Sequence, residues 1–118
     1  MLLSLPASVP IWLARQATDL RKSFDSLAEV VRQQLQDDPL SGQLFVFRNK
    51  RGDRVKLLYW DEDGFVIVYK RLEAGTFRFP AASGAGVQMR AADLQMLLDG
   101  VDLSSVKRGR RYRRPAPA

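Results

Sequence analysis

Few residues of this sequence could take part in catalysis, because the chain of 118 residues contains no cysteine and no histidine. Their absence excludes a Cys nucleophile, a His general base, a disulfide, and a zinc site built on thiolate or imidazole. Three consecutive acids, Asp61, Glu62 and Asp63, are of the type that binds Mg²⁺ in nucleases. Consecutive side chains in a tight turn diverge, however, and Asp63 before Gly64 is a common hairpin sequence. We therefore predict a protein without catalytic residues, metal or cofactor.

Basic side chains offer a binding function instead. Five of them crowd a predicted strand, loop and strand, and only Asp53 opposes them: Arg48, Lys50, Arg51, Arg54 and Lys56. Such a cluster can neutralise DNA phosphates, and Asn49 and Gly52 would allow close approach to the backbone. An ordinary solvated hairpin loop explains the same residues. The sequence leaves both interpretations open.

The most basic segment is the C-terminal one, residues 104–118, which contains six bases and no acid. The whole chain has a net charge of +6, so residues 1–103 are formally neutral. Like charges repel and no apolar pattern continues here, which predicts a disordered tail. Arg-rich segments bind nucleic acid by releasing counterions, without base specificity, and Tyr112 could add stacking. The predicted contacts are Lys107, Arg108, Arg110, Arg111, Arg113 and Arg114.

Other candidates have simpler explanations than DNA binding. Arg21 and Lys22 follow Asp19, where a helix start could hold a phosphate, but Asp19 can equally pair with them. Lys70 and Arg71 end a predicted strand, where bases are common. Aromatic side chains could stack on bases. We expect most of them in the core, because the central strands are apolar on both faces: Trp12, Phe45, Phe47, Tyr59 and Trp60.

Hydrophobic spacing predicts the elements that position these groups. Strands are expected at residues 9–14, 44–47, 55–60, 65–72 and 76–79. Apolar residues at intervals of three or four predict a helix from a cap at Thr18 or Asp19 to about residue 36: Leu20, Phe24, Leu27, Val31 and Leu35. A second helix is expected at residues 91–98, with Gly100 ending it.

Short links between the middle strands require antiparallel pairing. The predicted fold is a small α+β domain: an antiparallel β-meander sheet with an N-terminal strand, one main helix packed on the sheet and a short C-terminal helix. It is expected to occupy residues 1–103, followed by the tail at 104–118. The apolar start is interrupted by Pro6 and Pro10, so neither a signal peptide nor a membrane span is predicted, and we expect a cytoplasmic protein without a membrane partner.

Several blocks of residues resemble a known family. They are residues 19–25 (Asp-Leu-Arg-Lys-Ser-Phe-Asp), 38–64 (from Asp-Pro-Leu-Ser-Gly-Gln to Trp-Asp-Glu-Asp-Gly), 69–73 (Tyr-Lys-Arg-Leu-Glu) and Phe79-Pro80. In order and spacing they are similar to the TnpB-type accessory protein of insertion-sequence-66 transposons, over nearly all of residues 8–100. Ser26 stands where this family often has Gly, and Phe79 where it often has Trp.

The resemblance implies a protein that is encoded beside a transposase and assists transposition. The family's DNA-cleaving site belongs to a separate protein, so the resemblance assigns no catalytic residue here. We predict a non-catalytic accessory protein that binds DNA non-specifically, binds the transposase of the same element, or does both. A pure protein-interaction adaptor without DNA contact is the alternative, and a metal-dependent nuclease is a third. The oligomeric state stays open.

Overall fold

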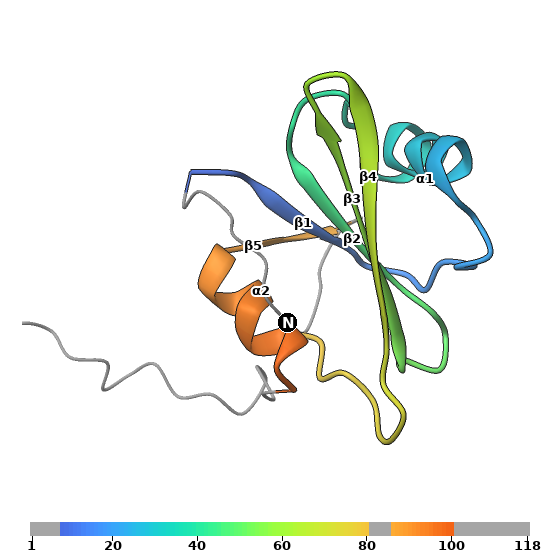
Figure 1. Cartoon of the computed structure of the whole chain (residues 1–118), viewed down its shortest axis with the longest axis vertical. Coiled ribbons are helices and arrows are strands. Elements are labelled where there is room, and N and C mark those ends of the chain that lie inside the picture. Colours follow the sequence, from blue (N-terminus) through green and yellow to red (C-terminus); the bar gives the residue numbers. More distant parts are fainter. Residues whose placement is uncertain (1–7, 81–85, 101–118) are drawn as a thin grey trace, which may run out of the picture.

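The computed structural model describes residues 8–80 and 86–100, which form one mixed sheet with a helix on each face (Figure 1). The sheet has five strands in the order β4-β3-β2-β1-β5. The strands are β1 (Ile11–Ala14), β2 (Leu44–Arg48), β3 (Arg54–Asp61), β4 (Gly64–Arg71) and β5 (Gly86–Met89). The helices are α1 (Phe24–Val30), its π-helical continuation η1 (Val31–Leu35), and α2 (Ala91–Leu98). The predicted small α+β fold, with one main and one short C-terminal helix, is confirmed.

The middle of the sheet is the expected meander. β2 pairs antiparallel with β3, and β3 pairs antiparallel with β4 over its whole length. The second link is the predicted tight hairpin, in which Asp61 pairs with Gly64 and Glu62 takes a positive φ of 52°. Local turn chemistry was therefore enough to predict this part of the topology.

The outer strands differ from the prediction. β1 pairs with β2 in parallel, which is possible because α1 and η1 supply a long crossover between them. β5, not residues 76–79, is the fifth strand, and it pairs antiparallel with β1. The strand predicted at residues 76–79 is wrong because Phe77 donates its backbone N–H to Gly52 O (2.8 Å) and buries its ring in the core. The alternation of polar and apolar residues at 76–79 arises because Phe77 packs into the core beside the β2–β3 loop, and not because these residues pair in the sheet.

The main helix begins later than predicted. Ser23, rather than Thr18 or Asp19, precedes its first turn, and the Ser23 backbone N–H is accepted by Ser26 Oγ at 2.9 Å. Thr18 instead donates its backbone N–H to Arg48 O (2.7 Å), which holds the preceding segment against the end of β2. Phe24, one of the apolar residues whose spacing predicted this helix, is 45% exposed. The end near residue 36 agrees with the prediction, because η1 stops at Leu35.

Two apolar layers stabilise the sheet. Successive side chains of a strand point to opposite faces, and each face of β2 is covered, one by α1 and the other by α2. Phe45 and Phe47 pack in the layer under α1, whereas Leu44 and Val46 pack in the layer under α2. In the described part of the chain, no helix is long and apolar enough to cross a membrane.

Candidate nucleic-acid interface

Three segments that are distant in sequence meet at one end of the sheet. Residues 19–21, the β2–β3 loop and the C-terminal end of β4 line two adjoining hollows, which share Arg54 and Tyr69. In the register of β3 and β4, Arg54 lies opposite Arg71 and Lys56 opposite Tyr69, so their side chains emerge on one face. We name this region the Tyr69 surface and define it as Arg21, Arg51, Arg54, Tyr69 and Arg71.

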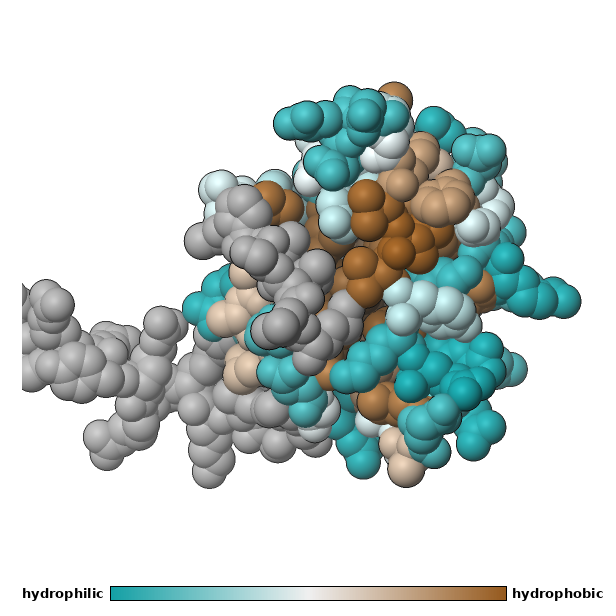
Figure 2. Space-filling view, viewed as in Figure 1, coloured by the Kyte–Doolittle hydropathy of each residue, from teal (hydrophilic) through white to brown (hydrophobic). Residues whose placement is uncertain are grey.

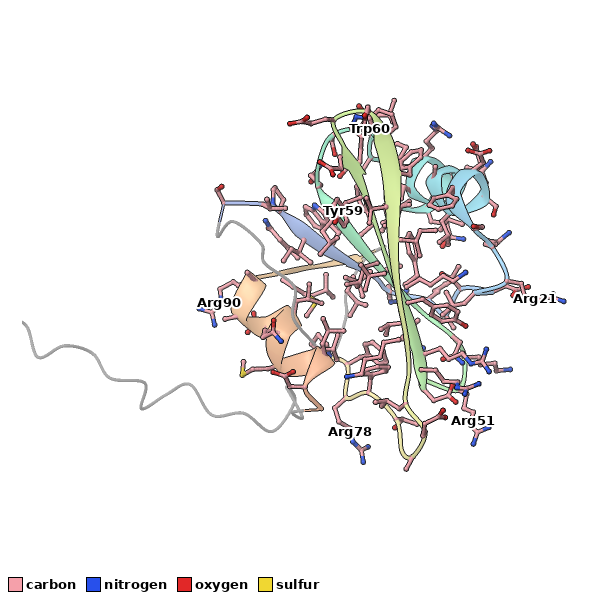
Figure 3. The ribbon with its side chains drawn as sticks, viewed as in Figure 1. Arg21, Arg51, Tyr59, Trp60, Arg78 and Arg90 are labelled. Atoms are coloured by element: carbon pink, nitrogen blue, oxygen red, sulfur yellow. The ribbon has the colours of Figure 1, made fainter. Side chains whose placement is uncertain are left out.

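The aromatic ring at its centre is held between cations. Tyr69 is 48% exposed, and Arg54 Nη1 donates a hydrogen bond to its Oη at 3.1 Å. Lys56 Nζ lies 4.8 Å from the ring centroid. Figure 3 shows Arg21 and Arg51 extending outward near this end, far from Trp60 at the other. An exposed ring among basic side chains is a typical platform for a nucleic-acid base and its phosphates.

Lys56 does not occupy the place expected of a phosphate ligand. It is 8% exposed, and Nζ donates a hydrogen bond to Lys22 O at 2.7 Å. Its ammonium therefore ties the segment before α1 to the sheet and supports Tyr69 from within. The sequence could not distinguish it from Arg54, because both are bases on the same strand face.

The β2–β3 loop is pinned, not a freely solvated turn. Asn49 Oδ1 accepts hydrogen bonds from the backbone N–H of Gly52 (2.9 Å) and of Arg54 (3.1 Å), and Asn49 Nδ2 donates to Asp53 Oδ1 (2.7 Å). Gly52, with φ of 83°, is buried against Thr76. The expectation that Asn49 and Gly52 offer backbone groups to a phosphate is wrong, because these groups are used within the loop.

Three of the four arginines have an acidic neighbour. The closest N–O distances are 2.6 Å for Arg21 with Asp19, 2.7 Å for Arg71 with Glu73, and 3.8 Å for Arg51 with Asp53. All three guanidinium groups are more than half exposed, and such surface pairs contribute little and exchange readily for another anion. Arg54 forms no salt bridge with any residue that the structure describes.

The pKa values of two carboxylates at this surface, Asp19 and Asp53, are lowered by their neighbours. Hydrogen bonds from the Arg21 side chain and backbone lower the pKa of Asp19 to about 2. The pKa of Asp53 is also lowered, first by the hydrogen bond from the Asn49 side chain and further by the charges of Arg51 and Arg54. Both acids are therefore ionised at neutral pH and orient the arginines beside them.

The remaining predicted residues lie elsewhere. Arg48 is on the opposite face, where its guanidinium carbon lies 5.4 Å from the Phe79 ring centroid and Nη2 donates to Arg15 O at 3.1 Å. Lys50 is exposed in the loop. Lys70 donates from Nζ to Leu98 O (2.7 Å), at the negative end of α2. The six tail residues, Lys107, Arg108, Arg110, Arg111, Arg113 and Arg114, lie outside the described residues.

The aromatic side chains mostly follow the core prediction. Phe45 and Phe47 are completely buried, so they cannot stack on a base. Trp12 is half-buried and donates from Nε1 to Gln43 Oε1 at 2.7 Å. Trp60 packs edge-on against Phe65 with ring centroids 5.1 Å apart. Sequence reasoning missed Tyr69, whose only signal was its place beside Lys70 and Arg71 at the end of a strand.

The opposite end of the sheet is acidic. Asp61, Glu62 and Asp63 are exposed in the β3–β4 hairpin. Across residues 8–80 and 86–100, no group of three or more acids is arranged to hold a metal ion.

Comparison with known proteins agrees with this chain's motifs. The model of the family described as IS66 Orf2 like protein matches residues 9–108. The chain belongs to this family. It is therefore an accessory protein of an insertion sequence, as the resemblance implied. The matched region contains the whole Tyr69 surface.

Two relatives come from Sinorhizobium fredii. The uncharacterized protein y4hO is 40% identical over 95 residues, which cover 80% of this chain and 83% of the relative. The uncharacterized protein y4jC is 38% identical over 98 residues, covering 83% of this chain and 84% of the relative. No solved structure matches the chain.

Proposed function

We propose that this insertion-sequence accessory protein binds DNA through the Tyr69 surface. The observation that carries the proposal is the convergence of Arg21, Arg51, Arg54 and Arg71 around one half-exposed tyrosine. A guanidinium has five N–H donors in a planar fork and matches a phosphate with two parallel hydrogen bonds. Arginines already paired with surface acids keep spare donors, and Arg54 forms no salt bridge with a described acid.

The tyrosine favours unpaired or distorted DNA over an intact duplex. Every base has a π-face, so stacking on Tyr69 is independent of sequence, whereas the bases of a duplex are already stacked. We expect weak binding, with Kd of roughly 10⁻⁴ to 10⁻⁶ M at physiological salt, that falls steeply as salt rises. The basic tail would add phosphate contacts without adding specificity.

The transposase of the same element is the second proposed partner. Membership in a family of insertion-sequence proteins supports this partner, and the acidic hairpin end supplies a surface distinct from the Tyr69 surface. A pull-down with that transposase, with and without element-end DNA, tests this part. One outcome would favour the adaptor interpretation instead. In it, the accessory protein binds no DNA and captures the transposase equally well with and without DNA.

The DNA proposal is tested by removing two arginines of the surface. Arg54→Ala with Arg71→Ala should weaken single-stranded DNA binding about tenfold at low salt and reduce the salt slope by about 1.4, or about 0.7 for each arginine removed. The matched control is Arg32→Ala with Arg90→Ala, which removes the same charge from two exposed arginines paired with Glu29 and Asp93. Equal affinities and slopes for both double variants, measured by fluorescence anisotropy at several salt concentrations, would exclude the Tyr69 surface.

Stacking has its own test at the same position. Tyr69→Phe keeps the ring and should keep most of the affinity for single-stranded DNA, whereas Tyr69→Leu should lose roughly tenfold, since one stacked base contributes about 1–3 kcal/mol. Duplex binding should change little in either variant. A loss that is equal for single-stranded and duplex DNA would contradict base stacking and leave only the phosphate contacts.

A further inference from the structure

The two edges of the sheet are unequal. The β5 edge is short, with four residues that include Gly86 and Gln88, and it leads directly into α2. The β4 edge has eight residues, contains no proline, and no described segment pairs with its outer side. An edge strand exposes unpaired backbone N–H and C=O groups, which proteins usually protect with short strands, proline or several charges. β4 lacks these protections over most of its length.

The side chains of β4 are apolar on both faces. Phe65, Val66, Ile67 and Val68 are all partly exposed, although Phe65 and Ile67 pack on the layer under α1 and Val68 on the layer under α2. Figure 2 shows apolar side chains gathered over β4, with polar side chains toward both ends of the strand. A strand added beside β4 would extend both apolar layers at once.

We propose that a second copy of this chain pairs with β4, antiparallel and about a two-fold axis through Ile67. A two-fold axis perpendicular to a sheet keeps each face on its own side, so the residue on the axis must lie opposite itself. With Ile67 there, Phe65 lies opposite Tyr69 of the second copy, and Asp63 opposite Arg71 of the second copy. This register uses nearly the whole strand, Gly64–Arg71.

Charge selects this arrangement over its alternatives. β4 begins next to the acidic hairpin of Asp61, Glu62 and Asp63 and ends in Lys70 and Arg71. Parallel pairing of two copies would set acid beside acid and base beside base, and like charges directly opposite destabilise a strand pair. Antiparallel pairing brings each acidic end to the other copy's basic end, twice by symmetry. The same charges disfavour the addition of an unrelated basic or acidic strand.

A charge exchange tests the pairing in solution without DNA. Wild-type protein should show a concentration-dependent dimer by sedimentation or light scattering, and Arg71→Glu should weaken it roughly tenfold, since two acid–base contacts become repulsive. Asp63→Arg alone should weaken it similarly, and the double variant Asp63→Arg with Arg71→Glu should restore it. Unchanged melting temperatures would show that each variant is folded. A wild type that stays monomeric at its highest soluble concentration, or a double variant as weak as either single one, would overturn the proposal.

The register has an independent test, because the chain contains no cysteine. Ile67→Cys should form a disulfide-linked dimer on mild oxidation, as residues directly opposite have Cα atoms roughly 5 Å apart. Tyr69→Cys is the control, because the two copies of residue 69 would be about 13 Å apart, beyond the reach of a disulfide. Tyr69→Cys mixed with Phe65→Cys should crosslink. If Tyr69→Cys alone crosslinks as readily as Ile67→Cys, this register is wrong.

Discussion

The two ends of the sheet carry opposite charge, although the strands between them are largely apolar. At one end, residues 19–22, 48–56 and 69–73 contain nine bases and three acids. At the other, residues 36–43 and 60–64 contain five acids and no base. In antiparallel strands the loops alternate between ends, so the meander of β2, β3 and β4 sorts basic segments from acidic ones.

The contrast between the two ends shows that the net charge of the domain does not predict the charge of the Tyr69 surface. Residues 1–103 are formally neutral, which suggests that only the tail has surplus positive charge. The fold separates the charges by the length of β3, which is eight residues or roughly 26 Å. That distance exceeds the Debye length of about 8 Å at physiological salt. A phosphate at the basic end is therefore largely screened from the acids at the other end.

The largest expected effect on DNA affinity comes from removing the tail, after which only the basic and acidic ends of the folded domain contribute to binding. A chain that stops at Ser104 should lose about tenfold or more in affinity for duplex DNA. The slope of log affinity against log salt concentration should fall by up to about 0.9 for each Lys or Arg removed. The residual binding should still be sensitive to Arg54→Ala with Arg71→Ala. The melting temperature should not change, because no apolar pattern lies beyond that point. A substantial drop in melting temperature would show that the tail docks on the domain. Salt titration and thermal unfolding measure both quantities.

The next effect concerns what holds the basic end in shape. Asn49→Ala removes the side-chain acceptor of the Gly52 and Arg54 backbone N–H groups and the donor to Asp53, while Gly52 keeps the backbone carbonyl of residue 49 at 3.2 Å, and it should lower the free energy of unfolding by about 2 kcal/mol. DNA affinity should fall with it, since Arg51 and Arg54 flank the loosened turn. Gln43→Ala is the counterpart at the acidic end, where Gln43 accepts from Trp12 and donates to Asp37. It should destabilise the domain by a smaller amount and leave DNA affinity intact. If Asn49→Ala and Gln43→Ala lose DNA affinity equally, DNA binding does not depend on the shape of the β2–β3 loop.

The smallest effect is a pKa. In Arg21→Ala the pKa of Asp19 should rise from about 2 toward its ordinary value of 3.8. The substitution removes the side-chain hydrogen bond from Arg21, which is the largest cause of the lowered pKa. A carboxylate with a lowered folded-state pKa stabilises the fold above its unfolded pKa, and this contribution is lost as pH falls toward 2. Wild type and variant should therefore differ in stability at neutral pH and converge in that acidic window. An NMR titration of the Asp19 carboxyl in wild type and variant measures this change. An unchanged Asp19 titration in Arg21→Ala would contradict the pairing.

Much of the fold was predictable because its signals are local. Alternating apolar residues on either side of the run 61–64 indicated the hairpin of β3 and β4, although its two turn residues are Glu62 and Asp63 rather than Asp63 and Gly64. The spacing of Leu94, Leu97 and Leu98 indicated α2. The family was also recognisable from the order of motifs in residues 19–80. Periodicity failed where apolar residues serve a loop, as at Phe77, and where an extended segment precedes a helix, as at Thr18.

The sequence by itself determined which residues are basic, where the hairpin turns and which strands are apolar on both faces, since these depend on residue type and on near neighbours. Only the tertiary structure decided that Arg21, Arg54 and Arg71 surround Tyr69, that Lys56 is turned inward, and that Arg48 lies on the opposite face. Among the described strands, β4 forms an edge of the sheet because β1 and β5 lie on the far side of β2. Strand order and burial arise from contacts between distant segments, and no local pattern encodes which segments become neighbours.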